Sequence, residues 1–425
     1  MIQHGNLNLR SVMESGDHFK NGASPKSHTN RKNFSLAQMF STVYKILIII
    51  VITVFISDVA HAQTVQERQQ QVEQARLQAE QARQQAKQAR EQAAQAREQA
   101  AQVREQAAQV REQALETRAQ SAPEEYKTEV NKEFSVGSSP MLTVSNEFGN
   151  IRIIEGGAGK IAFNIKITGQ GTTQAEAKKN AESVDINLMQ TGNSVMSKTT
   201  LGRMACNNCG RKIEFEVTVP KNTKLTLENK YGDIYLDNVA EPLEVKLEFG
   251  KLYANALSKV SLDSKYGGAT INTCSDLELK SSFSKYKLGE VETVTASASY
   301  DEIKMDVLGN MDLKAGFTQV DIGKLNKSFQ AKDFSYGSLK IRGIDENFSK
   351  IKVNASFTPI DIAFTKNHNF KVSLYTSNGN IDTGNIVFYE KSLDKKDAVA
   401  GIAGKLKEPS ATVEITNSYG NIALE

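Results

Sequence analysis

The chain has 425 residues, with 52 Lys and Arg against 49 Asp and Glu, and a formal net charge of +3. The excess lies in residues 1–62, which hold six basic and three acidic groups, so the rest of the chain is formally neutral. A nucleic-acid partner is not expected, because such binding needs a basic surface to displace counterions from phosphates. Only one of the five His, His368, follows residue 62, which argues against a Ser/His/Asp triad or a histidine-rich zinc site.

Residues 1–62 have the features of a leader with a secretory signal peptide. Lys45 precedes the apolar run Ile46–Ile56, and a small-x-small sequence ends at Ala62. These three parts are typical of a signal peptide, and the run is shorter than the ~20 residues of a transmembrane helix. We predict cleavage after Ala62 and an extracytoplasmic location, whether periplasmic, cell-surface or secreted. An uncleaved signal anchor is the alternative, and a start at Met39 would give a signal peptide of ordinary length.

Residues 63–120 repeat every seven positions and predict a coiled-coil stalk. Ala or Val occupies nearly every a and d position from Val65 to Thr117, while Arg fills position e and Gln fills position g. Gly and Pro are absent from the repeat, and its residues are strong helix formers. An Ala seam buries little apolar area, but an isolated helix of this length lacks another driving force. We therefore expect a homo-oligomer through the stalk rather than a weakly associating helix, followed by a linker at residues 121–133.

Residues 134–220 are rich in β-strand patterns but have no regular period. Strands are expected near residues 141–154, 160–168, 184–189, 195–200 and 213–219, with a helix at residues 173–183. We interpret the segment as a β-rich N-terminal cap, since the open end of a stacked β-structure must be covered.

Within this cap, Cys206 and Cys209 form a CxxC motif in a Gly-bounded loop. The motif is compatible with a redox pair, half of a metal site or a local disulfide. A disulfide formed after export is favoured, because a second CxxC and a nearby His are missing and the loop lies at a hairpin tip. Cys274 would then stay unpaired.

A motif recurs, first at Phe148, then serially from Tyr231 and last at Tyr419: an aromatic, Gly or a small polar residue, any residue, an aliphatic, any residue, an aliphatic. From Tyr231 to Phe317 the steps between aromatics are 18, 17, 17, 17 and 17 residues. Residues four and two places before each aromatic should share one strand face with it, and the two aliphatics should lie on a second strand. We predict a mainly β fold with a parallel β-solenoid of ~17-residue coils over residues 221–425; an antiparallel sandwich or barrel is the alternative.

The aromatic residues are predicted to stack at one corner as an internal structural ladder rather than a ligand surface. The ladder comprises Phe249, Tyr266, Phe283, Tyr300, Phe317, Tyr336 and Phe357. The position between the paired aliphatics is charged on successive coils, at Lys287, Lys304, Asp321, Lys340 and Asp361. We interpret this row as an outward strand face with partly complementary charges, and a polysaccharide- or ion-binding ladder as the alternative.

The order of these elements resembles a known family. The short strand pair, the polar helix, the passage VTVPKNTKLTLENKYGDIYL at Val217–Leu236 and the serial aromatic units are similar to the bacterial putative-adhesin family, which is related to the heads of autotransporter adhesins. The resemblance covers residues 134–425. It implies an extracytoplasmic β-solenoid with no catalytic residues to carry over.

The patterns together predict an exported, non-enzymatic envelope or surface protein with an adhesin-like structural or interaction role. The alternative is an extracytoplasmic binding module for a glycan or a membrane partner, such as an envelope protein, in envelope-stress signalling. A carbohydrate-active β-helix is disfavoured, because ~17-residue coils leave little room for catalytic side loops. No cofactor and no metal are predicted.

Overall fold

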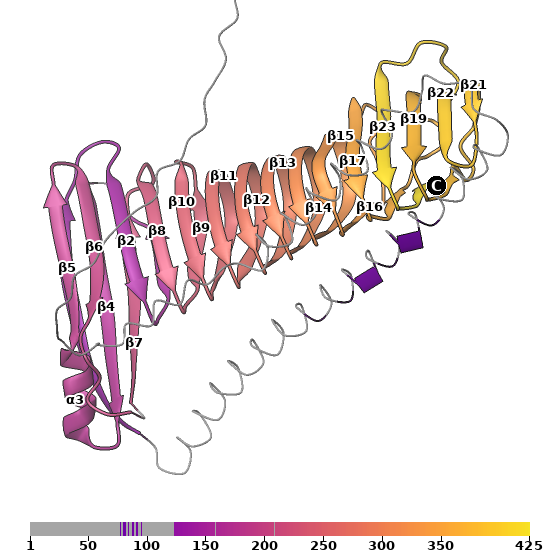
Figure 1. Ribbon diagram of the computed structural model, residues 1–425. Coiled ribbons are helices and arrows are strands. Elements are labelled where there is room, and N and C mark those ends of the chain that lie inside the picture. Colours follow the sequence, from indigo (N-terminus) through magenta and orange to yellow (C-terminus); the bar gives the residue numbers. More distant parts are fainter. Residues whose placement is uncertain are drawn as a thin grey trace, which may run out of the picture. The chain divides into compact units, whose positions relative to one another are not determined.

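The computed structural model describes residues 123–425, except Ala158 and Asn208, and eight helical residues between 77 and 95. The predicted signal peptide, its cleavage position and the rest of the predicted stalk lie outside the described residues. Within the described part of the chain, no helix is both long enough and apolar enough to cross a bilayer. Residues 123–425 hold 24 hydrogen-bonded strands and the helix α3 (Gln174–Glu182) (Figure 1).

The middle of the fold is a solenoid-like stack of parallel strands. Its long strands are β11 (Lys251–Lys265), β12 (Gly268–Ser282), β13 (Lys285–Ser299), β14 (Glu302–Gly316) and β15 (Gln319–Ser335). Each long strand bends part-way, as Figure 1 shows, and therefore contributes to two faces of its coil. Thus β9 (Ile234–Val239) pairs with the first part of β11, and β10 (Leu243–Glu248) pairs with its second part. The predicted mainly β, solenoid-like fold is confirmed, and the antiparallel alternative is wrong for the repeats.

The register explains why the sequence period is regular and then lengthens. Lys285 lies opposite Gly268 and Glu302, so successive coils are offset by one full motif. Between β14 and β15 the register shifts twice, between Leu308 and Asn310 and again between Lys314 and Gly316. Each shift is a β-bulge that inserts an extra residue. The longer step from Phe317 to Tyr336 is therefore a local insertion within an unbroken stack.

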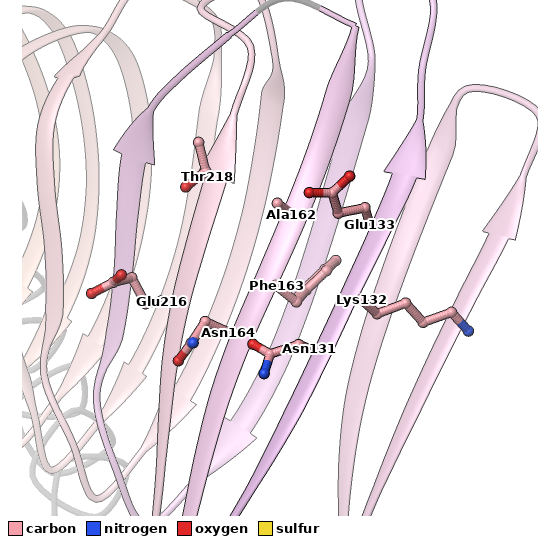
Figure 2. A pocket seen from close by; sticks show the side chains of 8 residues that line it. All are labelled: Asn131, Lys132, Glu133, Ala162, Phe163, Asn164, Glu216 and Thr218. Carbon is pink, nitrogen blue, oxygen red and sulfur yellow. The ribbon is translucent and has the colours of Figure 1, made fainter.

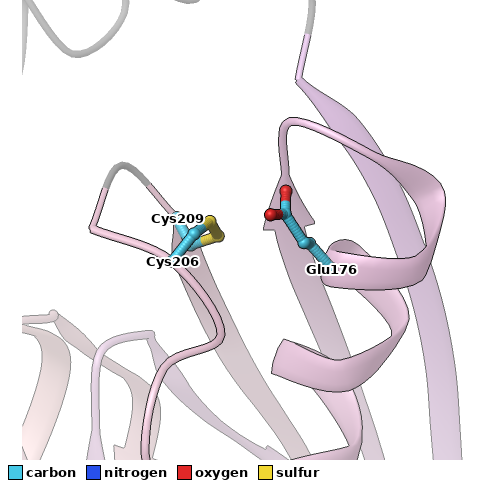
Figure 3. A group of neighbouring side chains, drawn as sticks. All are labelled: Glu176, Cys206 and Cys209. Carbon is cyan, nitrogen blue, oxygen red and sulfur yellow. A yellow bond between two sulfur atoms is a disulfide. The ribbon is translucent and has the colours of Figure 1, made fainter.

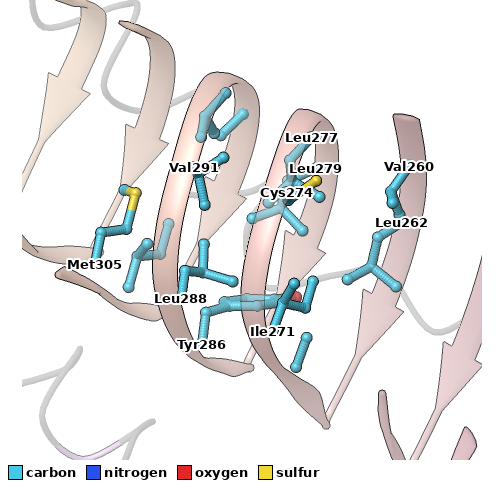
Figure 4. Close-up of a cluster of buried hydrophobic side chains, with 14 of the residues drawn as sticks. Val260, Leu262, Ile271, Cys274, Leu277, Leu279, Tyr286, Leu288, Val291 and Met305 are labelled. Atoms are coloured by element: carbon cyan, nitrogen blue, oxygen red, sulfur yellow. The ribbon is translucent and has the colours of Figure 1, made fainter. Parts of the chain in front are cut away.

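The interior of the stack is apolar because inward positions alternate along each strand. Figure 4 shows Leu262, Leu279, Tyr286 and Met305 packed between successive coils. All four are at most 2% exposed. The large ring of Tyr286 lies beside a small residue, and its hydroxyl is 2.6 Å from that of Ser281. Burial, the main cause, raises the pKa of Tyr286 to about 12.

The N-terminal cap is built across the first coil of the stack. β2 (Met141–Glu147) and β3 (Ile151–Glu155) pair in parallel with β8 (Lys224–Lys230) and β9, so they are a coil of the stack and not part of the cap. The cap strands lie beyond them: β4 (Lys160–Gly171), β5 (Val184–Thr191), β6 (Ser194–Leu201) and β7 (Gly210–Val219). β6 and β7 continue the parallel faces, whereas β5 and β4 pair with them antiparallel.

The predicted linker at residues 121–133 is wrong over most of its length. Glu124–Ser135 forms strand β1, which pairs antiparallel with β4 along twelve residues. Its sequence, EEYKTEVNKEFS, is dominated by charged residues. The weak alternation of Tyr126, Val130 and Phe134 was therefore not recognised as a strand pattern. Charges are common on an edge strand, because they discourage pairing with a further chain.

The C-terminal end is also reordered relative to the sequence. Its strands are β16 (Ser338–Ile341), β17 (Lys350–Ser356), β18 (Ile360–Ile362), β19 (Phe370–Thr376), β20 (Ile381–Asp382), β21 (Phe388–Asp394), β22 (Ala398–Ala403), β23 (Ala411–Ser418) and β24 (Ile422–Leu424). The last strand pair inserts between earlier coils, since β23 pairs with both β17 and β19. The antiparallel strands β22 and β21 then close this end. The predicted run of repeats to residue 425 is therefore corrected to a stack with a second cap.

Candidate functional site

One corner of the stack carries a continuous ladder of aromatic rings. Neighbouring rings are stacked with centroids 4.7–5.2 Å apart and planes within 11° of parallel. The ladder contains the seven predicted residues, Phe249, Tyr266, Phe283, Tyr300, Phe317, Tyr336 and Phe357, and three more, Phe148, Tyr231 and Tyr419. The same motif had marked those three in the sequence.

The ladder is partly exposed, whereas strand alternation predicted a fully internal one: Tyr300 is buried, at 8% exposed, but the rings on the first coils are open to solvent. Every ring residue has a left-handed backbone, with φ between 52° and 60°. This conformation ends the strand alternation, so Leu262 and Ser264 point inward while Tyr266 turns outward and stays 37% exposed. Phe148, Tyr231 and Phe249 are similarly exposed. Because each ring covers the face of the next, these four residues show mainly ring edges to solvent.

The corner also keeps the backbone hydrogen bonds of the stack. The N–H of Phe249 donates to Lys265 O at 3.0 Å, and that of Tyr266 donates to Ser282 O at 3.1 Å. A left-handed bulky residue is uncommon and costs about 1–2 kcal/mol. Ring stacking, at about 0.5–1.5 kcal/mol per pair, offsets that cost. The ladder is thus a structural device that closes each coil within a single residue.

The predicted charged row lies on the outward face of the coils. Lys287, Lys304, Asp321, Lys340 and Asp361 follow one another in parallel register. Lys340 contacts Asp361 at 2.8 Å, and Lys304 contacts Glu302 at 2.7 Å. The Lys304 and Lys285 ammonium groups lower the pKa of Glu302 to about 2. These exposed pairs fit the interpretation of a solvated strand face with complementary charges.

The same row contains an aromatic pair that the sequence interpretation missed. Tyr235 and Tyr253 stack at 5.2 Å, and the Arg152 guanidinium lies 5.2 Å from the Tyr235 ring centroid. Burial is the main cause that raises the pKa of both phenols. The available signal was the register itself, since Arg152, Tyr235 and Tyr253 occupy the position between the paired aliphatics on three successive coils.

A shallow depression lies on the outer side of the β1–β4–β7 sheet (Figure 2). Glu133 is in line with Ala162 and Thr218, whereas Glu216 is in line with Asn164 and Asn131. The two acids are therefore two strands and two residues apart, more than about 10 Å between Cα atoms. This separation does not make a paired acid site. The lining consists of Asn131, Lys132, Glu133, Ala162, Phe163, Asn164, Glu216 and Thr218.

The CxxC loop lies beside helix α3, a proximity that the sequence interpretation did not foresee. Cys206 and Cys209 are joined by a disulfide, with Cα atoms 5.4 Å apart. Glu176, in the first turn of α3, faces the two sulfurs (Figure 3). One carboxylate oxygen of Glu176 and both sulfurs lie within 4.8 Å of one another. Glu176 lies 30 residues before Cys206, and its capping-box position gives no sign of the cysteines, so only the fold brings it to them.

Cys274 is placed differently from the CxxC pair. It lies in the core between Ile271 and Leu277, where it is 4% exposed (Figure 4). Burial, the main cause, raises the pKa of this thiol to about 11. A buried thiol with a raised pKa is unreactive, so Cys274 acts as a small core residue.

The geometry defines a class of protein, a stack of parallel β-coils with a cap at each end and an aromatic ladder at one corner. Residues 141–425 match the family model of the Toastrack DUF4097 domain. This match spans more than half of the chain, and the chain therefore belongs to the Toastrack DUF4097 family. The predicted resemblance to the putative-adhesin family is confirmed.

Among the solved structures that are similar to this chain are two putative adhesion proteins. One is a putative adhesin from Parabacteroides merdae, with 11% identity, coverage of 55% of this chain and 95% of that chain, and a TM-score of 0.32. Another is a putative cell adhesion protein from Clostridium sporogenes, with 8% identity, coverage of 70% and 99%, and a TM-score of 0.19. Because these TM-scores are low, the assignment rests on the family model. No curated protein matches the chain.

Proposed function

We propose that the protein is an exported, adhesin-like structural and interaction protein of the cell envelope, with a β-solenoid head on a coiled-coil stalk. The observation that supports this most is the construction of the coils. Each coil closes at one left-handed aromatic residue, and its hydrogen bonds continue through that corner. A stack in which each unit contacts only its neighbours suits a spacer or display surface.

A non-enzymatic role is part of the proposal. The charged residues of the central coils engage one another across the strand face, as in the Arg342–Asp321 and Lys340–Asp361 pairs. Catalytic acids would instead have to converge on a substrate cleft with perturbed pKa values. The short corners of the described coils favour structural use over catalysis.

Export is supported by the leader pattern and by the Cys206–Cys209 disulfide, since disulfides persist in oxidising compartments. Cell fractionation followed by N-terminal mass spectrometry tests it. We expect the chain in an extracytoplasmic fraction with Gln63 as its first residue. Cytoplasmic recovery with residues 1–62 intact would contradict the proposal.

The stalk is tested by sedimentation of the mature chain. Ala93→Arg places a charge at seam position a, whereas Glu91→Arg changes the outward position f of the preceding heptad. We expect the wild type and Glu91→Arg to sediment as the same oligomer and Ala93→Arg to dissociate. If all three are monomers, the stalk does not cluster the heads.

A second candidate, a binding module for a glycan or a membrane partner, is favoured by the exposed ring edges at Phe148, Tyr231, Phe249 and Tyr266. Glycans bind best to open ring faces, and here the neighbouring rings cover those faces, so a membrane partner is the better occupant. Vesicle flotation with and without Tyr231→Lys tests this candidate. Flotation of the wild type that the substitution abolishes would support a lipid surface as the partner, and no flotation would exclude a lipid surface.

A further inference from the structure

The CxxC loop is held against α3 by buried polar contacts. Asn180, which is fully buried, accepts a hydrogen bond from Ala205 N–H at 2.7 Å and donates to Gln170 O at 2.9 Å. On the other side of the loop, the Arg211 guanidinium donates to Gly202 O and to the Ser183 hydroxyl, each at 2.9 Å. The position of the two cysteines beside the helix is therefore built by the fold and is not a feature of the loop alone.

Glu176 is fixed in the same way. Its Oε2 accepts from Thr172 N–H at 3.0 Å and from Thr173 N–H at 3.2 Å, and it also accepts from the Thr172 hydroxyl. These contacts, led by the Thr172 hydroxyl, lower the pKa of Glu176, so the carboxylate is ionised. All three of these hydrogen bonds use Oε2. The carboxylate is thus held in place while one oxygen lies towards the sulfurs.

We propose that reduction of the Cys206–Cys209 disulfide creates a three-ligand site for a thiophilic divalent cation, of which Zn²⁺ is the expected type, formed by both thiolates and the Glu176 carboxylate. Reduction by a dithiol transfers two electrons and two protons to the disulfide and yields two thiols, while the dithiol becomes a disulfide. Zinc binding then releases the two thiol protons. The disulfide and the metal site are alternative states of the same loop.

The geometry and the ligand chemistry agree with this site. Zn–S bonds of about 2.3 Å and Zn–O bonds of about 2.0 Å place tetrahedral ligand atoms about 3.5–3.8 Å apart. The three atoms lie within 4.8 Å of one another. After reduction the two sulfurs move apart from their bonded distance, and the carboxylate oxygen moves by at most about 1 Å, to reach this spacing. Two thiolates beside a carboxylate repel one another, and a cation removes that repulsion. Three protein ligands leave a fourth position for water, as in open zinc sites.

Metal binding by the reduced full mature chain tests the site directly. Co²⁺ should give a thiolate-to-cobalt charge-transfer band, and Zn²⁺ should displace it in a one-to-one titration. The oxidised chain should bind neither ion. The double substitution Cys206→Ser, Cys209→Ser should abolish the band, and Cys274 should not compensate because it is buried in the core.

Glu176→Gln separates a ligand role from helix capping. Gln can keep the capping box, since Glu and Gln both serve there, but it loses the charge. Zn²⁺ affinity should fall at least about tenfold, a loss that even an outer-sphere partner can cause. Glu182→Gln, on the last turn of the same helix, is the matched control and should bind as the wild type does. Absence of Co²⁺ binding by the reduced wild type, or equal affinities of the two Gln variants, would overturn the proposal.

Discussion

The central coils and the N-terminal cap of this protein are stabilised in different ways. In the coils, equivalent residues lie above one another, so rings stack on rings and aliphatic residues on aliphatic residues. In the cap, strands far apart in sequence pair antiparallel, and a helix packs on them through buried small and polar residues such as Ala177, Asn180 and Ala181. The coils repeat one packing arrangement, whereas the cap depends on individual contacts that each occur once.

This difference indicates which positions tolerate substitution. When a substitution disturbs one coil, the coils on both sides have equivalent packing and still support it. Only positions where the backbones approach most closely should therefore be intolerant of substitution. In the cap, a lost polar contact has no equivalent elsewhere. The experiments below order these effects from the largest to the smallest.

Gly250→Ala should have the largest effect, since the corner glycines let successive coils approach. A Cβ at Gly250 would lie 1.9 Å from Gly232 O, which is backbone and cannot move aside alone. We expect a loss of more than about 3 kcal/mol in the free energy of unfolding, at the upper end of overpacking effects. Gly157→Ala is the matched control, because nothing lies within 4 Å of its added Cβ. Denaturant unfolding that shows equal losses would refute the close approach.

Asn180→Ala should destabilise the cap strongly. It removes both hydrogen bonds of a fully buried amide, to Gln170 O and from Ala205 N–H, and leaves both backbone groups without this partner. We expect about 2–3 kcal/mol in denaturant unfolding and faster amide exchange in residues 202–210. Asn187→Ala, an exposed residue of β5, should change stability by less than about 0.5 kcal/mol. A small loss for Asn180→Ala would mean that the loop does not need this contact.

Tyr266 tests the corner itself. Tyr266→Ala removes stacking against Phe249 at 5.0 Å and Phe283 at 5.2 Å and should cost about 1–3 kcal/mol. Tyr266→Gly should be at least as stable as Tyr266→Ala, because Gly adopts the left-handed backbone without strain. Lys246→Ala, on an outward position, is the control and should cost less than about 0.5 kcal/mol. If Ala is clearly more stable than Gly in chemical denaturation, the left-handed corner is wrong.

Glu302→Gln should have the smallest effect, and that effect should depend on pH. The folded-state pKa of Glu302 is lowered to about 2 by Lys304 and Lys285. A lowered folded pKa stabilises the protein above the unfolded pKa, and this stabilisation is lost as pH falls from about 4.5 towards 2. At pH 7 the wild type should be more stable than Glu302→Gln by less than about 1 kcal/mol, because the pairs are partly exposed. Urea unfolding should show this difference shrinking below pH 4.5, and a difference that stays constant down to pH 3 would refute the role of these pairs.

Much of the fold could be predicted from the sequence because its signals are local. The equal steps between aromatics identified the stack, and alternation identified the inward residues of each strand. The helix at residues 173–183 was also predicted, and in the structure Thr173 and Glu176 form a capping box within its first turn. These features depend on residues at most one coil apart, and the sequence displays such neighbours directly.

The tertiary structure decided what depends on backbone handedness and on distant pairing. Residue types alone did not show that Tyr266 turns outward, because its left-handed φ follows from closing a coil against its neighbours. Likewise, β1 forms a strand because it pairs with the free edge of β4. The last strand pair inserts beside β17 through pairing between residues far apart in sequence. The meeting of Glu176 with Cys206 and Cys209 has the same origin. Such contacts depend on which edges and surfaces remain open after the local elements have formed.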